Sequence, residues 1–164
     1  MLFTGHYEHS IDAKGRLAIP AEIRSLWSLE RDGHAWFAVP WIGRIIRLYT
    51  ETGFRTRATS YSSDLTPDED IAELNTTLFG LTRRLELDAS GRVRLPDELL
   101  ELAGLHSTVV LIGAGDWLEV RDRDEWKRSI PTRLQQLPEL MKRVEMKRRS
   151  QRGGMGADTP SGGE

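Results

Sequence analysis

The chain of 164 residues contains no cysteine and no long hydrophobic run. The absence of cysteine excludes a disulfide framework and thiolate chemistry. No apolar stretch approaches the roughly 20 residues that a membrane-spanning helix needs. The N-terminus also leads directly into a predicted strand without the pattern of a signal peptide. We therefore expect a cytoplasmic protein with no membrane partner.

An excess of positive charge is also missing. The chain has 23 Lys and Arg against 25 Asp and Glu, which gives a net charge of −2 at pH 7. Bulk electrostatics would not hold such a monomer on nucleic acid. A DNA-binding function would therefore need a localised basic face repeated in an oligomer. Several weak sites acting together can raise apparent affinity about 10²–10⁴-fold.

Patterns typical of catalytic and metal sites are not found either. His6 and His9 flank Glu8, but alternation along a strand places His9 on the opposite face, which disfavours a three-ligand metal site. The other two histidines are isolated in the sequence. The glycines around Ala114 lack the strand-to-helix context of a phosphate loop, and there is no nucleophile turn. We predict that the protein is not an enzyme and uses no cofactor, metal or small-molecule substrate.

The sequence does contain an internal repeat. Residues 10–26, SIDAKGRLAIPAEIRSL, recur 76 positions later as residues 86–102, ELDASGRVRLPDELLEL. Between the identical positions, residues that are apolar in the first copy are also apolar in the second. This period is too long for a solenoid and indicates two similar half-domains. The identical positions are Asp12/Asp88, Ala13/Ala89, Gly15/Gly91, Arg16/Arg92, Pro20/Pro96, Glu22/Glu98 and Leu26/Leu102.

Each copy predicts a strand, a tight turn, a second strand and a short helix. Asp12 and Gly15 suit the first and last positions of a hairpin turn, and Asp88 and Gly91 repeat them. The proline that follows each second strand suits the first turn of a helix. We expect three apolar side chains of each helix to face the core. These are Ile23, Leu26 and Trp27 in the first copy, and Leu99, Leu102 and Ala103 in the second, where the helix ends at Gly104.

Two further strands follow each copy, at 36–39 and 45–49 and then at 108–112 and 117–121. The glycine-rich residues 113–116 predict a hairpin turn between the last two. Together these elements predict a mainly β protein with short helices, that is, an α+β fold.

The segments outside the repeats are expected to be a linker, a helix and a tail. Residues 60–64 are typical of a loop, and Thr66 begins a capping-box pattern for a helix that ends at Gly80. This helix either packs the halves together, which we favour, or lies between subunits. Pro138 begins a segment in which apolar residues recur at helical spacing. Residues 139–152 contain six cations and two carboxylates. That segment contacts DNA phosphates, contacts another subunit, or is simply solvated. From Gly153 the composition predicts disorder.

These patterns divide the chain into five parts. We expect a first domain over 1–58, a linking helix over 59–80, a second domain over 81–128, a basic helix over 129–152 and a disordered tail over 153–164.

Basic side chains gather at the predicted turns. Lys14 and Arg16 lie at the first hairpin tip with Arg24 close by, and Arg92 and Arg94 alternate onto one strand face. Arginine can bind guanine bidentately in the major groove, lysine suits phosphates, and a two-stranded ribbon fits the groove. The alternative is that Arg16 and Arg92 only brace the turns by pairing with the aspartates.

The sequence resembles the MraZ family of bacterial transcriptional regulators. The resemblance covers about residues 1–128 and is most specific in MLFTG at 1–5, IDAKGRLAIP at 11–20 and LDASGRVRLP at 87–96. It also includes AGL at 103–105, VVLIG at 109–113 and DRDEW at 122–126. The resemblance implies two AbrB-like (SpoVT-AbrB) swapped-hairpin domains that form a pseudo-symmetric barrel.

The resemblance also implies a function. We expect a sequence-specific DNA-binding regulator, usually a repressor, of cell-division and cell-wall genes. It would bind short direct repeats of double-stranded DNA upstream of its own operon, as a ring-like homo-oligomer associated with the nucleoid. The family signature maps onto Asp12/Arg16 and Asp88/Arg92, and its basic turn residue onto Lys14.

The sequence departs from the family pattern in the first half, where Gly53 and Phe54 stand in place of a counterpart of residues 124–126, and at three single positions. Ser90 stands where the first copy has Lys14, Thr4 occupies a position that is often basic, and Leu100 replaces the counterpart of Arg24. Because the second turn has lost a cation, we expect it to contribute less to DNA binding. Two other functions stay open: an antitoxin-type regulator of the same superfamily, and a protein-binding or structural adaptor that does not bind DNA.

Overall fold

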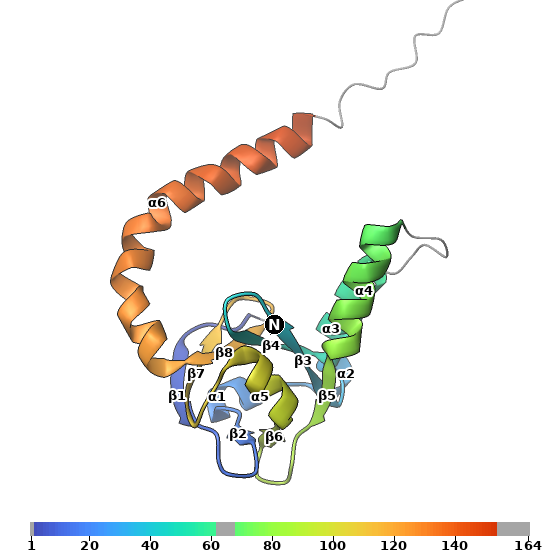
Figure 1. Cartoon of the computed structure of the whole chain (residues 1–164), viewed down its shortest axis with the longest axis vertical. Coiled ribbons are helices and arrows are strands. Elements are labelled where there is room, and N and C mark those ends of the chain that lie inside the picture. The colour runs from blue at the N-terminus through green and yellow to red at the C-terminus, as the bar shows by residue number, and fades with distance from the viewer. Residues whose placement is uncertain (1, 62–67, 154–164) are drawn as a thin grey trace, which may run out of the picture. The chain divides into compact units, whose positions relative to one another are not determined.

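The computed structural model describes residues 2–61 and 68–153 and shows an α+β fold with antiparallel strands (Figure 1). The first half contains four strands and three helices. These are β1 (His6–Ser10), β2 (Arg16–Ala18), α1 (Ala21–Ser25), α2 (Leu29–Asp32), β3 (Ala35–Trp41), β4 (Ile45–Thr50) and α3 (Glu51–Tyr61).

The second half also has four strands, but it begins with a helix, has one short helix between its second and third strands, and ends in a long helix. Its elements are α4 (Glu69–Leu81), β5 (Arg83–Glu86), β6 (Arg92–Arg94), α5 (Asp97–Ala103), β7 (Thr108–Gly113), β8 (Leu118–Asp122) and α6 (Arg123–Gly153). The predicted order of strand, turn, strand and short helix is therefore confirmed in both copies. The predicted turn before β8 is also present, with the Ala114 amide donating to the Trp117 carbonyl at 2.9 Å.

Strand β3 pairs with β4 and β7 pairs with β8 within the halves, but β1, β2, β5 and β6 each pair with a strand of the other half. The larger sheet has the order β1-β7-β8-β4-β3-β5, and β2 pairs with β6 in a separate two-stranded sheet. In the first copy the strands on either side of the turn share only the single bridge Ile11–Leu17. The six-stranded sheet is not closed, so the predicted barrel is not confirmed.

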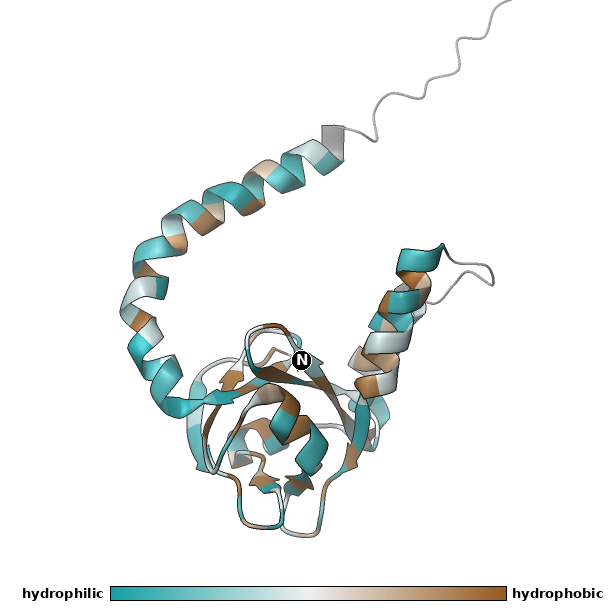
Figure 2. Ribbon diagram, in the orientation of Figure 1, coloured by the Kyte–Doolittle hydropathy of each residue, from teal (hydrophilic) through white to brown (hydrophobic). Residues whose placement is uncertain are grey.

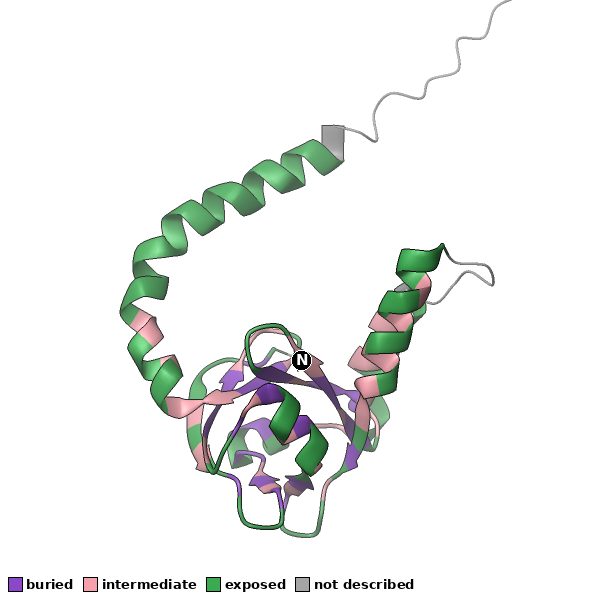
Figure 3. Ribbon diagram, in the orientation of Figure 1, coloured by how far each residue is buried: buried purple, intermediate pink, exposed green. Residues whose placement is uncertain are grey.

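One hydrophobic core serves residues 1–126, which form a single compact unit. Leu17 and Val93 from the small sheet are fully buried beside Trp36, Leu48 and Leu111 from the large one. Figure 2 shows apolar residues on the strands, and Figure 3 shows that these strands are the buried part of this unit. Because strands of both copies contribute to this core, neither half has a separate one.

The two short helices differ from the prediction in one respect. Ile23 and Leu99 are buried as expected, but Leu26 and Leu102 are 45% and 54% exposed. Leu26 lies beyond the end of α1 at Ser25, and Leu102 lies on the side of α5 opposite the buried Leu99 and Ala103. The predicted end of α5 at Gly104 is confirmed by its left-handed conformation, with φ of 57°.

Helix α3 was not predicted, because its sequence has little apolar periodicity. Tertiary contacts hold it instead. The Thr50 hydroxyl accepts a hydrogen bond from the Gly53 amide at 3.0 Å, and Glu51 accepts one from the His34 amide at 2.9 Å. Phe54 stacks on Phe37 of β3 with ring centroids 4.6 Å apart. The predicted loop over 60–64 is thus wrong at residues 60 and 61, and 62–64 lie outside the described residues.

Helix α4 confirms a helix in the linker but corrects two details. Asp68, not Thr66, is the N-cap, and its carboxylate accepts from the Ile71 amide at 3.0 Å. Thr66 itself lies outside the described residues. We expected the helix to pack into the core, but none of its residues is buried, and Ile71 and Leu74 are 42% and 43% exposed.

Helix α6 begins at Arg123, six residues before the start of the basic helix that we expected over 129–152. The carboxylate of Asp122 accepts from the Glu125 amide at 2.8 Å, which caps the first turn. Pro131 and Pro138 lie inside the helix. Each proline removes one backbone hydrogen bond, but the helix continues through both. The predicted tail over 153–164 lies, apart from Gly153 at the end of α6, outside the described residues.

A second unit begins at Lys127, and α6 is exposed there from residue 131 to residue 151 (Figure 3). No helix in 2–61 or 68–153 combines the length and the apolar character needed to cross a bilayer.

Candidate nucleic-acid interface

The predicted site residues come together on the two-stranded sheet of β2 and β6. In its register Arg16 lies opposite Arg94, Leu17 opposite Val93, and Ala18 opposite Arg92. Since side chains alternate along a strand, the buried Leu17 and Val93 face the core and the arginines lie on the outer face. We call this outer face, with its two turns, the arginine ribbon. It consists of Asp12–Ala18 and Asp88–Arg94.

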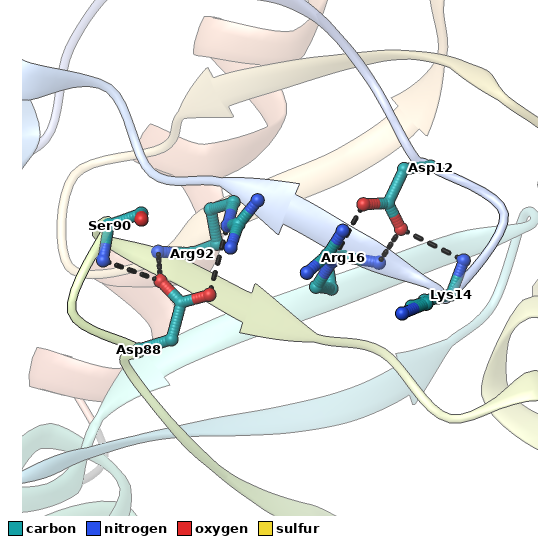
Figure 4. A network of polar contacts seen from close by, with 6 residues as sticks. All are labelled: Asp12, Lys14, Arg16, Asp88, Ser90 and Arg92. Carbon is teal, nitrogen blue, oxygen red and sulfur yellow. Dashed lines mark hydrogen bonds and ion pairs between the residues drawn. The ribbon is translucent and has the colours of Figure 1, made fainter.

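The two copies of the repeat are related by an approximate twofold axis that passes through the arginine ribbon. The Ile19 amide donates to the Gly91 carbonyl at 3.0 Å, and the Leu95 amide donates to the Gly15 carbonyl at 2.8 Å. Because the strands are antiparallel, each copy's turn lies at one end of the ribbon (Figure 4). The duplicated sequence thus presents the same chemistry twice on one surface.

An aspartate organises each turn. Asp12 Oδ1 accepts hydrogen bonds from the amides of Lys14 and Arg16, both at 2.9 Å. Asp88 Oδ1 accepts from the amides of Ser90 and Arg92 at 2.8 and 3.0 Å. These contacts have the geometry of an Asx turn. Figure 4 shows these contacts in both turns.

The same aspartates also bind the arginine side chains. Arg16 Nε lies 2.7 Å from Asp12 Oδ2, and Arg92 Nε lies 2.9 Å from Asp88 Oδ2. The structure therefore contains the bracing pairs that we considered as an alternative to DNA contact. These pairs engage only Nε. Within the described residues, the terminal nitrogens of both guanidinium groups have no hydrogen-bond partner, so they can still bind an anion or a base edge.

The remaining basic residues surround these pairs. Arg24 Nε donates to the Ile19 carbonyl at 3.1 Å, and its guanidinium lies over Gly91 of the other copy. Lys14 and Arg94 are exposed, and their charged ends have no ion-pair partner in the part of the chain that the structure describes. All five predicted contact residues therefore lie on one region of the surface.

The pairing of Arg16 with Arg94 was not predicted from the sequence. Two arginines directly opposite on one face of a sheet repel each other, which destabilises the sheet when nothing neutralises them. Asp12 neutralises only Arg16. A bound anion, such as a phosphate, would relieve the repulsion, so this arrangement suits a surface that receives a polyanion.

The departures from the family pattern occupy different environments. Leu100, at the position equivalent to Arg24, packs against the core instead of lying over the opposite turn. Ser90 and Thr4 are exposed. The two ends of the ribbon thus differ in charge, with the Lys14 end more basic than the Ser90 end.

The pKa of Asp12 is lowered to about 2, mainly because its carboxylate accepts from the Arg16 amide, with further contributions from the Arg16 side chain and the Lys14 amide. Contacts of the same kind lower the pKa of Asp88. A depressed pKa contributes stability above the unfolded value of about 3.9, and this contribution is lost as pH falls towards 2.

We expect a carbon-detected NMR titration to give a pKa near 2 for the Asp12 carboxyl. In Arg16→Ala, the pKa of Asp12 should rise but stay below its ordinary value, because the side-chain contact is lost while the two amides still donate to the carboxylate. A value near 3.9 in the folded wild-type protein would contradict this turn geometry.

No group of three or more His, Cys, Asp or Glu side chains in the described residues could hold a metal ion. His6 and His9 lie on β1, where His6 has its ring centroid 6.4 Å from that of Trp126. The absence of enzymatic activity and of cofactors stays a prediction.

Comparison with known proteins gives the family. A family model described as "MraZ protein, putative antitoxin-like" matches residues 78–147. The chain is 32% identical to the transcriptional regulator MraZ of Dictyoglomus thermophilum over 126 residues, which are 77% of this chain and 83% of that protein. It is 33% identical to the one from Dehalococcoides mccartyi over 127 residues, covering 77% and 86%.

The chain belongs to the MraZ family. A third relative, the transcriptional regulator MraZ of Coxiella burnetii, is 31% identical over 126 residues, or 77% of this chain and 83% of that protein. The relatives are named as transcriptional regulators. The predicted family is therefore confirmed, while the residues that carry the function stay a prediction.

Proposed function

We propose that the protein is a sequence-specific DNA-binding transcriptional regulator, acting as a repressor, whose arginine ribbon enters the major groove. The observation that carries this proposal is the placement of Arg16, Arg92 and Arg94 on the outer face of one two-stranded sheet. B-DNA has a major groove about 12 Å wide, which admits a two-stranded ribbon. The names of the relatives support the regulatory role.

Within this proposal the basic residues have distinct roles. Arg16 and Arg92 would use their free terminal nitrogens on base edges, with Arg94 between the two turns. Lys14 would contact a phosphate, and Arg24 would support the turn around Gly91 while adding positive charge. Asp12, Gly15, Asp88 and Gly91 would hold the turns in shape.

The proposal includes assembly, because the net charge of −2 gives one copy little general attraction for DNA. We propose a ring-like homo-oligomer, cytoplasmic and associated with the nucleoid. It would bind direct repeats upstream of its own operon and of cell-division and cell-wall genes. The exchange of strands between the halves supports the swapped-hairpin AbrB-like architecture for each copy.

The experiment that tests this function is binding of the purified protein to its own upstream DNA across a salt series. We expect a preference over random DNA of the same length and affinity that falls steeply with salt. Equal affinity for both DNAs would overturn the proposal and favour a protein-binding adaptor.

Lys14→Ala is expected to weaken binding to specific and random DNA by similar factors and to lower the salt slope by about 1 for each subunit that contacts DNA. A phosphate contact carries no base preference, so specificity should persist. Arg55→Ala, which removes an exposed cation from α3, is the matched control and should leave the slope unchanged. A selective loss of specific binding in Lys14→Ala would instead assign the lysine to a base.

A further inference from the structure

Helix α4 carries an apolar stripe that the rest of its compact unit does not cover. Ile71, Leu74 and Leu78 follow at spacings of three and four, so they share one face of the helix. The first two are 42% and 43% exposed. Leu78 also lines a pocket of about 260 Å³ with Tyr49, Phe54, Phe79 and Trp117, so the stripe runs into an aromatic recess.

The flank of this stripe is acidic. Asp70 and Glu73 are adjacent on the neighbouring row of α4, and Asp68 and Glu69 lie at its N-terminus. Residues 68–81 contain no lysine or arginine. Within the described residues, no cation pairs with Asp70 or Glu73. A partner for this surface therefore needs an apolar stripe with a basic flank.

Helix α6 has this pattern. Leu134, Leu137, Met141 and Val144 recur at spacings of three and four and are 65%, 46%, 58% and 40% exposed. Arg143 and Lys147 border the stripe on one side. Two α6 helices would not suit each other, because residues 139–152 contain six cations and two carboxylates and would repel in a pair.

We propose that α6 of one copy covers the apolar stripe of α4 in a second copy, with Arg143 and Lys147 facing Asp70 and Glu73. This inference rests on the homo-oligomeric part of the proposed function and names the surfaces that build it. The two surfaces differ, so the contact is head-to-tail. Contacts of that kind close into rings when the rotation between copies permits it.

Charge reversal tests the contact on both sides. We expect the wild-type mass, measured by light scattering on a sizing column, to fall in Glu73→Lys and in Arg143→Glu. Each single variant sets like charges against each other at every contact. The double variant Glu73→Lys/Arg143→Glu should recover the wild-type mass. Lys142→Glu, on another face of α6, makes the same charge change and should leave the mass unchanged. Circular dichroism would verify that the variants stay helical.

An equimolar mixture of the two single variants identifies the partner. In the mixture, each reversed α6 meets a reversed α4 and each normal α6 meets a normal α4, so contact between copies predicts recovery of the full mass. Recovery of the wild-type mass in the double variant, but not in the mixture, would overturn the proposal. It would mean that α4 and α6 of the same chain contact each other. Unchanged mass in both single variants, or a monomeric wild type, would also overturn it.

DNA binding is a separate readout. Arg16→Ala should keep the wild-type mass while losing specific DNA. The two charge reversals should keep the ribbon intact but lower apparent affinity for repeated DNA by at least about 10²-fold through lost multivalency. A wild-type oligomer that shows no preference for its own upstream DNA would refute the proposed function alone. Specific DNA binding by an oligomer whose mass neither charge reversal changes would refute this inference alone.

Discussion

Replacing Arg16 with alanine is expected to abolish specific DNA binding and leave the fold intact. Its guanidinium uses Nε on Asp12 and presents its terminal nitrogens on the outer face. A bidentate contact to guanine is worth roughly 1–3 kcal/mol of discrimination, and an oligomer loses it at every subunit. The substitution also leaves the Asp12 carboxylate without its side-chain partner, which adds a negative charge facing the DNA.

The structure offers a close control for this variant. Arg55 pairs with Glu51 four positions earlier at 3.0 Å, as Arg16 pairs with Asp12, but lies on α3 away from the ribbon. We expect Arg55→Ala to bind specific DNA like the wild type in a fluorescence anisotropy titration. Unchanged affinity in a folded Arg16→Ala variant would show that this arginine only braces the turn.

The second copy should contribute less. Arg92 has the same pairing with Asp88, but its turn carries Ser90 in place of a lysine. Arg92→Ala is therefore expected to reduce specific affinity less than Arg16→Ala does. The opposite order would mean that the phosphate contact of Lys14 does not determine which end of the ribbon dominates.

Gly15→Ala is expected to lower the free energy of unfolding by about 2–5 kcal/mol. Gly15 has φ of +75°, in the left-handed region that costs other residues about 1–2 kcal/mol. A Cβ there would also lie 2.5 Å from the Leu95 carbonyl oxygen. Relief of that overlap requires the backbones of β2 and β6 to separate, which disturbs the buried pair beneath them at a further cost of about 1–3 kcal/mol.

Gly91→Ala is the matched control, since Gly91 is the equivalent residue and has φ of +73°. Its Cβ would lie 2.7 Å from the Arg24 side chain, whose flexible end can move aside. We expect a loss of about 1 kcal/mol here and a larger loss at Gly15, measured by urea unfolding at equal protein concentration. Equal losses would show that only the left-handed backbone matters at both turns.

The local part of the site could be predicted from the sequence. The spacing of Asp12, Gly15 and Arg16, repeated 76 residues later, indicates the turns, because an Asx turn depends on residues within a few positions of the aspartate. The outward alternation of Arg92 and Arg94 follows in the same way from strand geometry. All nine predicted site residues lie in or beside the arginine ribbon.

Other features have no local pattern. Helix α3 depends on Phe54 stacking on Phe37 and on the Thr50 cap, contacts that its weak periodicity does not reveal. The start of α6 was placed too late, at residue 129, because residues 122–128 were assigned to the second domain, whereas the Asp122 carboxylate caps the first turn of the helix. Exposure of α4 is likewise decided by the surroundings of the helix. An amphipathic pattern predicts that one face of a helix is buried, but it does not identify the surface that buries it.

The sequence by itself determined the duplication, the two turns and the family, because each follows from the identity and order of nearby residues. Only the tertiary structure decided that β2 pairs with β6, so that Arg16 faces Arg94 across the two copies. Strand pairing joins residues far apart in the chain, and the free energy that selects it comes from the shared burial of Leu17 and Val93. No local sequence pattern indicates that β6 is the partner of β2.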